Sequence, residues 1–141
     1  MARLGGEFAV LMMLSLTEEN VDQLTQNLND LNDKGLMVIS RRTDLSRIDK
    51  FQGFVPYEIS VIGADHEGIV NSVARYLASE QINVEEMDTR VTNAPNTGTP
   101  LFSMTAKVQA PPELSLSQLR SKLADVCDEL DVDIEITVPL G

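Results

Sequence analysis

The pattern of apolar and polar positions over residues 56–138 predicts six elements. Apolar residues alternate with polar ones at 57–61, which is typical of a half-buried strand, and recur at helical spacing at 69–77. Further strands are predicted at 82–91, 101–108 and 132–138, and a second helix at 116–130. Strand, helix, strand, strand, helix, strand is the order of the ferredoxin-like, or split βαβ, unit. We therefore expect an α+β sandwich in which a four-stranded antiparallel sheet packs against two helices.

The first 40 residues show a shorter version of the same pattern. Residues 8–16 are apolar at almost every position, as expected for a strand in the middle of a sheet with both faces covered. Asn20 and Gln23 have the spacing of a helix-capping box, and Gly35 is placed to end that helix in the left-handed conformation. A second apolar run, residues 36–40, is predicted to be another strand.

An internal repeat relates the two parts of the chain. Sliding the sequence along itself superposes two capping boxes, two helical leucine stripes and two apolar strands. The matched residues are Asn20 with Ser115, Gln23 with Gln118, and Phe8, Val10, Met12 and Leu14 with Phe102, Met104, Ala106 and Val108. We expect a partial unit at 1–42, which is the second half of the repeat, a linker at 43–55 and a complete unit at 56–141.

The partial unit lacks the chain that would form its first strand and helix. A complete copy would need about as many residues before Gly5 as lie between Pro56 and Thr99, but only four precede it. In the strand order 4-1-3-2 of this fold, the two apolar runs would flank an empty slot. Because uncovered apolar strands are templates for pairing, we expect strand exchange or sheet extension in a homodimer. The alternative is that Met1 is an internal methionine of a longer protein.

The stretch from Gly63 to Val70 joins the first strand of the complete unit to its first helix. Asp65 is placed to cap the helix, and Gly68 lacks a side chain where another backbone or a small ligand could approach. Such an elbow presents backbone N–H donors to an anion, including the carboxylate of an amino acid. The simpler interpretation is that Asp65 is only a cap and Gly68 only a packing residue. His66 could donate to a bound carboxylate, respond to pH, or be merely exposed.

Composition and charge exclude several classes of function. Eleven basic residues against 22 acidic ones give a net charge of −11, so the surface should repel nucleic acids and anionic membranes. Cys127 is the only cysteine, which suits a reducing cytoplasm. The apolar run at residues 8–14 is too short to span a bilayer, and no secretory signal pattern precedes it.

The order of these elements and the motif at the elbow resemble the ACT domain family of small-molecule sensors. The residues that carry the resemblance are Gly63, Asp65, Gly68, Ile69 and Val70 at the elbow, Asn83 and Val84 at the entry to the next strand, and the segment from Leu4 to Phe8. The resemblance implies a non-enzymatic regulatory protein, without a cofactor, that binds a small amino acid such as glycine at an interface between ACT units. The implied ligand-binding residues are Asp65, His66, Glu67, Gly68, Ile69, Val70 and Asn83.

The two-copy arrangement resembles that of ACT regulators of glycine metabolism, which act through a DNA-binding transcription factor without touching DNA. This chain departs from the family at His66 and Glu67, where a basic residue and a proline are common. Glu67 adds a negative charge beside a site expected to hold a carboxylate, and could instead contact the ammonium group. The alternatives are a detached regulatory module of an amino acid or folate enzyme, and an interaction module without a ligand.

Catalytic and metal chemistry have little support in the sequence. With one histidine, the chain has no histidine cluster for a metal, and Cys127 lies on a distant helix. Glu85, Glu86 and Asp88 form an acidic run that we interpret as a solvated edge, with a divalent metal site as the alternative. A basic cluster is also present in the linker region, where we interpret it as a solvated connector rather than a site for a carboxylate or an acidic partner. Its members are Arg41, Arg42, Arg47 and Lys50.

Overall fold

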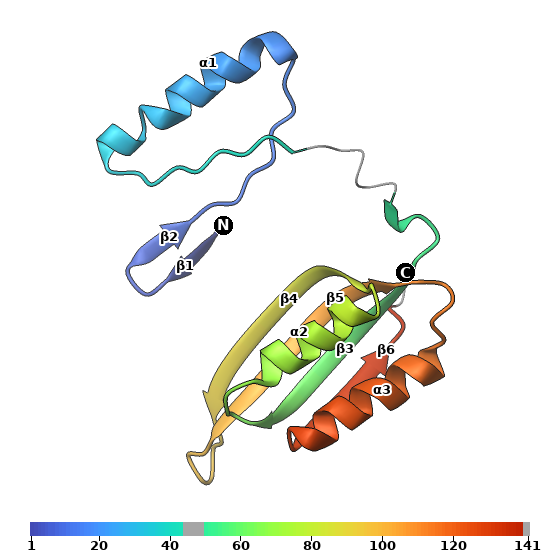
Figure 1. The fold of residues 1–141 in the computed structure, drawn as a ribbon. Coiled ribbons are helices and arrows are strands. Elements are labelled where there is room, and N and C mark those ends of the chain that lie inside the picture. Colours follow the sequence, from blue (N-terminus) through green and yellow to red (C-terminus); the bar gives the residue numbers. More distant parts are fainter. Residues whose placement is uncertain (44–49, 140–141) are drawn as a thin grey trace. The chain divides into compact units, whose positions relative to one another are not determined.

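The computed structural model describes residues 1–43 and 50–139, with the side chains of Ala2 and Leu4 excepted. The chain divides into two compact units, Met1–Asp44 and Leu45–Gly141 (Figure 1). Within the described residues, none of the helices has the length and apolar character needed to cross a membrane. Arg47 of the predicted basic cluster lies outside the described residues.

The second unit is a four-stranded antiparallel sheet with two helices on one face (Figure 1). Its strands are β3 (Val55–Ala64), β4 (Asn83–Asn93), β5 (Pro100–Ala110) and β6 (Val132–Thr137), and its helices are α2 (Ile69–Ser79) and α3 (Leu116–Glu129). The strands lie in the order β4-β5-β3-β6, so the first and third strands of the unit are central. The predicted ferredoxin-like α+β fold is confirmed.

The core lies between the sheet and the two helices and is mainly aliphatic. Ile59 and Val61 of β3 are fully buried, as are Val73 of α2 and Leu119 of α3. Two details of α2 differ from its apolar pattern. Val70 is 39% exposed, whereas the ring of Tyr76 is buried. The first turn of α2 therefore turns Val70 outward, beside the elbow, while Tyr76, near the other end of the helix, belongs to the core.

A β-bulge in β4 places Met87 opposite the buried Ala106 of β5. The pairing of β4 with β5 shifts register between Val84 and Glu86, as the slip in apolar phase predicts. After the bulge, the Glu86 carboxylate lies 2.6 Å from the Lys107 ammonium, and Asp88 accepts a hydrogen bond from Arg90 at 3.2 Å. Because Glu85 also accepts from Asn83 at 2.7 Å, all three carboxylates of the acidic run have protein partners.

Both helix-to-strand connections of the second unit contain a non-glycine residue with positive φ. Gln81 follows α2 with φ 57°, and Asp131 follows α3 with φ 53°. Left-handed backbone normally favours glycine because a Cβ is crowded there. The two connections therefore end their helices in the same way, which gives the two halves of the unit a common geometry.

The first unit contains a short hairpin and one helix. Strands β1 (Ala2–Leu4) and β2 (Glu7–Ala9) pair around Gly5, whose φ is 59°. Helix α1 (Glu18–Asn29) is followed by a turn of 3-10 helix, η1 (Asn32–Lys34), which ends at Gly35 with φ 85°. The capping box predicted at Asn20 is wrong, because α1 begins one turn earlier with Thr17 as its N-cap, and the Asn20 amide donates to the Thr17 hydroxyl at 2.9 Å.

The two strands predicted from the apolar runs of the first unit are wrong for most of their length. Only Phe8 and Ala9 of residues 8–16 lie in a strand, and residues 36–40 lie in none. A strand needs a neighbour for its backbone hydrogen bonds, and within this unit only β1 provides one. None of the side chains described in residues 1–43 is buried. The first unit thus has apolar segments but no core of its own.

Candidate functional site

The elbow begins where β3 ends at Ala64 and ends where α2 begins at Ile69. Its conformation differs from the predicted one, because the N-cap of α2 is Gly68 and no side chain caps the helix. The prediction that Asp65 caps α2 is therefore wrong. Instead, the Asp65 N–H donates to the Pro100 carbonyl at 3.0 Å, which attaches the elbow to the start of β5. The amino-terminal N–H groups of α2 have no side-chain acceptor, so they remain directed toward an anion that approaches this end.

The two glycines of the elbow serve different purposes. A Cβ on Gly63 would lie 2.5 Å from Cγ1 and 3.0 Å from Cα of Val132, so the close backbone approach is here, between β3 and β6. A Cβ on Gly68 would meet nothing within 4 Å, but its φ of 97° favours glycine. The space beside Gly68 is open, as a ligand would require, whereas the packing role predicted for it belongs to Gly63.

His66 connects the elbow to the end of α3. Its Nδ1 lies 3.0 Å from the Glu67 carbonyl oxygen, and its Nε2 lies 2.6 Å from the carbonyl oxygen of Leu130, the C-cap residue of α3. These two hydrogen bonds raise the pKa of His66 above its usual value, because both carbonyls can be satisfied together only by the doubly protonated ring. The nearby carboxylates of Asp65 and Asp131 act in the same direction.

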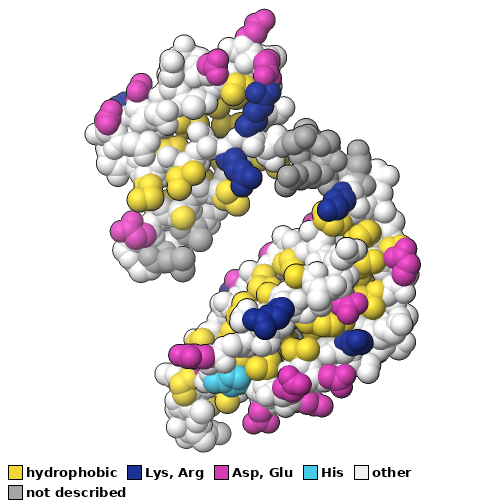
Figure 2. Space-filling model, viewed as in Figure 1, with side chains coloured by type: hydrophobic (Ala, Val, Ile, Leu, Met, Phe, Trp, Pro, Cys, Tyr) yellow, Lys and Arg dark blue, Asp and Glu magenta, His cyan; other side chains and the backbone are white. Residues whose placement is uncertain are grey.

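His66 is exposed, and its cyan side chain is visible at the surface of the second unit in Figure 2. Both ring nitrogens are directed at carbonyls, so the ring, when protonated, donates two hydrogen bonds that connect the elbow to the end of α3. Nothing in the local sequence around His66 indicates Leu130 as its partner, because the two residues lie far apart in the chain. The Gly63–Val132 approach did have a signal, since a glycine inside a strand often marks a close backbone contact.

The remaining candidate residues are divided between the two ends of the sheet. Ile69 is buried and anchors the first turn of α2, while Glu67 is exposed and accepts from His66 through its backbone carbonyl. Asn83 pairs with Gln109, at the end of the sheet where β3 begins, whereas the elbow lies where β3 ends. Within one copy, Asn83 and the elbow are therefore not brought together. Asn83 could complete an elbow site only from another unit.

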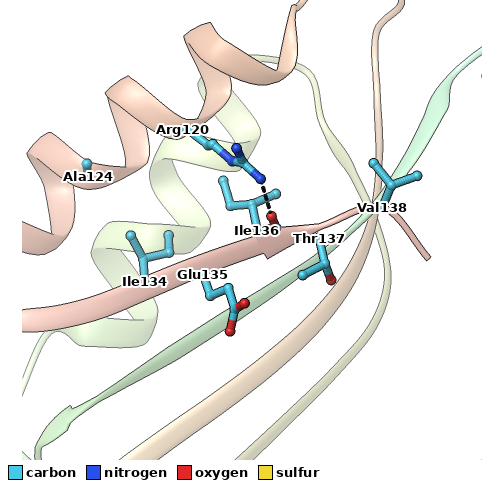
Figure 3. A pocket seen from close by; sticks show the side chains of 7 residues that line it. All are labelled: Arg120, Ala124, Ile134, Glu135, Ile136, Thr137 and Val138. Carbon is cyan, nitrogen blue, oxygen red and sulfur yellow. Dashed lines mark hydrogen bonds between the residues drawn. The ribbon is translucent and has the colours of Figure 1, made fainter. Parts of the chain in front are cut away.

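A cavity of about 560 Å³ lies away from the elbow, between α3 and the open edge of β6 (Figure 3). It is lined by Arg120, Ala124, Ile134, Glu135, Ile136, Thr137 and Val138. The Arg120 guanidinium donates to the Ile136 carbonyl at 2.9 Å, so this side chain closes one side of the cavity. Ile134 and Ile136 point toward α3, and Glu135 points to the other side of the strand (Figure 3). The cavity is thus an exposed strand edge beside a helix rather than an extension of the elbow.

The described residues offer no arrangement suited to metal binding or thiol chemistry. No group of three or more His, Cys, Asp or Glu side chains in residues 1–43 and 50–139 is placed to hold a metal ion. Cys127 is buried, and burial raises the pKa of its thiol, which disfavours the reactive thiolate.

The fold and the elbow define the class of protein that this chain resembles. No family model matches the sequence, and no curated protein matches it. Among solved structures, an ACT domain protein from Streptococcus pneumoniae is 25% identical with a TM-score of 0.52, over 60% of this chain and 90% of that one. The resemblance to the ACT family predicted from the sequence is confirmed.

Two further structures extend the comparison. An unknown protein from Galdieria sulphuraria is 30% identical with a TM-score of 0.57, over 72% of this chain. This chain spans 55% of the length of that protein. A protein described as a glycine cleavage system transcriptional repressor has a TM-score of 0.60 over 89% of this chain and 69% of its own. At 17% identity, that likeness concerns the fold alone.

Proposed function

We propose that this chain is a non-enzymatic regulatory protein that binds a small amino acid at the elbow and thereby modulates a partner protein. The observation that carries the proposal is the open space at Gly68 in front of the uncapped amino terminus of α2, within an ACT fold. We further propose that it acts in the cytoplasm as a homo-oligomer, without a cofactor. Its process is transcriptional control of glycine metabolism, exerted through a DNA-binding transcription factor. With a net charge of −11, the chain itself would repel DNA.

The elbow offers complementary groups for both ends of an amino acid. The free N–H groups of α2 and the positive charge of His66 favour a carboxylate. Asp65 and Glu67 are exposed carboxylates next to them and would favour the ammonium group. Val70, partly exposed at the same helix end, leaves apolar surface for a small side chain. Asn83 would join the site from a second copy.

A thermal-shift screen against the twenty amino acids tests the proposal, because a ligand that prefers the folded state raises its stability. Calorimetry on any hit then compares Gly68→Val with the wild type. We expect Gly68→Val to abolish binding, since a β-branched side chain would occupy the open space. Gly53 also has a positive φ, 84°, with nothing near its missing Cβ, so Gly53→Val is a control for backbone strain away from the elbow. Wild-type affinity in Gly68→Val would show that the ligand binds elsewhere.

A second candidate function is that of a regulatory module that works with a separate enzyme of folate metabolism. A formyltetrahydrofolate deformylase from Pseudomonas putida shares the fold, with 20% identity and a TM-score of 0.51, and this chain covers 29% of it. This candidate predicts that a catalytic polypeptide co-purifies with the chain and changes its rate when the chain is added. Co-purification with a DNA-binding protein instead would support the first candidate. A chain that binds no amino acid would be an interaction module alone.

A further inference from the structure

The first unit exposes two apolar segments, residues 8–16 and 36–40, and within this unit only Phe8 and Ala9 of them have a strand partner. Leu11 is 97% exposed, and Met37 and Ile39 are 91% and 87% exposed. Neither residues 8–16 nor residues 36–40 contain a charged side chain. Exposed, uncharged apolar segments of this length are candidate interaction surfaces, because they present apolar side chains to water and most of their backbone has no strand partner. In residues 36–40, Leu36 and Val38 donate their N–H groups to Leu31 and Asn32 without forming a strand.

The second unit shows how such segments are completed. It consists of two strand-helix-strand halves, β3-α2-β4 and β5-α3-β6, and in neither half do the two strands pair with each other. Each half leaves a slot that the first strand of the other half fills, which gives the order β4-β5-β3-β6. Exchanging the two halves leaves this order unchanged. The halves are therefore related by an approximate two-fold axis between β3 and β5, consistent with the shared left-handed residues Gln81 and Asp131.

The first unit has the sequence of elements of one such half. An apolar run is followed by α1, by a left-handed residue at Gly35 and by a second apolar run. We propose that two copies of this chain pair through their first units, each supplying one half of a four-stranded, two-helix sandwich. A two-fold axis makes such an interface self-complementary, as closed dimers require. This proposal gives the homo-oligomer of the proposed function a specific interface, but it involves no residue of the elbow and needs no amino acid, so pairing and amino acid binding can fail separately.

The register of the dimer follows from the internal repeat. Ala106 pairs with Ile59 at the centre of the second unit, and both side chains are fully buried. Met12 is the residue of the first unit that corresponds to Ala106. In the dimer, Met12 would therefore face the partner's Met12, with Val10 opposite the partner's Leu14. The only carboxylate at this end of the strand, Glu7, would face the partner's Thr17, so no like charges meet.

The existing hairpin is compatible with this arrangement. β1 covers β2 only along Glu7–Ala9. In the second unit, β6 pairs with Glu58–Gly63, the part of β3 that precedes the helix. The corresponding part of the first unit is residues 11–16, which β1 leaves free. The partner's residues 36–40 can therefore lie beside 11–16 while β1 stays paired with β2.

Cysteine cross-linking of the full chain tests the register. Directly opposite residues of an antiparallel pair have Cα atoms about 4.5–5.5 Å apart, which a disulfide can bridge. Met12→Cys, in a Cys127→Ala background, should form a disulfide-linked dimer under mild oxidation. Met13→Cys is the matched control, because Met13 would face the partner's Leu11 and lie about 8 Å from its own equivalent. We expect at least about tenfold faster linkage for Met12→Cys.

Light scattering after size exclusion, without added amino acid, provides the second measurement. The wild type should have twice the 15.5 kDa mass of one chain. Met12→Lys should lose the dimer, because two like charges would face each other, whereas Met13→Lys should keep it. A monodisperse monomer would overturn the proposal and indicate that a different polypeptide covers the segments. Equal linkage of the two cysteine variants would overturn it as well.

Discussion

Substitution of Gly63 by alanine should strongly destabilise the second unit. The added Cβ would lie 2.5 Å from Cγ1, 2.9 Å from Cβ and 3.0 Å from Cα of Val132. Rotation of the valine side chain can relieve only the first of these contacts. Since the other two involve Cβ and the backbone, β3 and β6 would have to move apart where Gly63 and Val132 pair.

The size of the effect can be worked from this geometry. Overpacking a well-packed core costs about 1–3 kcal/mol, and a clash with backbone belongs in the upper half of that range. Replacing glycine by alanine also restricts the unfolded chain, which stabilises the folded state by about 0.4–1 kcal/mol. We therefore expect a net loss of about 2 kcal/mol in the free energy of unfolding. For a unit of this size, that lowers the Tm by about 10 °C.

Tyrosine fluorescence during urea unfolding reports this change selectively. The chain has two tyrosines, Tyr57 and Tyr76, both in the second unit, and no tryptophan. Val132→Gly removes Cγ1 and Cβ, the atoms at 2.5 and 2.9 Å, so in that background Gly63→Ala should cost about 1 kcal/mol less than it does alone. A Gly63→Ala variant as stable as the wild type would refute the close approach of β3 and β6. Equal costs in both backgrounds would refute the assignment of the clash to Val132.

Three further predictions concern single side chains. Gln81→Gly should stabilise the second unit by about 0.5–1 kcal/mol in urea unfolding, because it relieves a left-handed backbone. Glu80→Gly, at φ −89°, should instead destabilise the unit by a similar amount, so equal effects of the two substitutions would contradict this prediction. His66 should titrate above its ordinary pKa of 6.5 by NMR. Its contribution to stability should be fully present below pH 6.5 and be lost as the pH rises through the raised pKa, so a ring that titrates below 6.5 would argue against its two carbonyl partners. Tyr76→Phe should leave stability unchanged or raise it by up to about 1 kcal/mol in thermal unfolding, because the buried Tyr76 hydroxyl has no hydrogen-bond partner among the described residues. A clear loss of stability would show that the hydroxyl has a hydrogen-bond partner.

The second unit was predictable from sequence because its signals are local and agree with one another. Alternation along β3, β5 and β6, the Ser115–Gln118 capping box and the phase slip near Glu85 each correspond to an observed feature. In each case, the residues that give the signal are the ones that form the feature.

The first unit and the details of the elbow were less predictable, for two physical reasons. An apolar run such as residues 8–16 has strand character, but whether it forms a strand depends on a neighbour that the run does not specify. At the elbow, the partners of Asp65 and His66 are carbonyls of Pro100 and Leu130, and every residue carries a carbonyl. The sequence can therefore locate the elbow, but it does not identify the groups that hold it.

The bulge at Glu85 also has a meaning for how this sequence can vary. Along a strand, successive side chains occupy two alternating faces, so deleting a paired residue exchanges the faces of everything that follows it. Glu85 is the residue that the bulge leaves unpaired, because Val84 pairs with Val108 and Glu86 with Lys107. Deleting Glu85 would therefore leave Glu86 opposite Lys107 and Met87 opposite Ala106. A single-codon deletion at this point should remove the bulge and keep the faces of β4, whereas a deletion at Thr89 would exchange them for the rest of the strand.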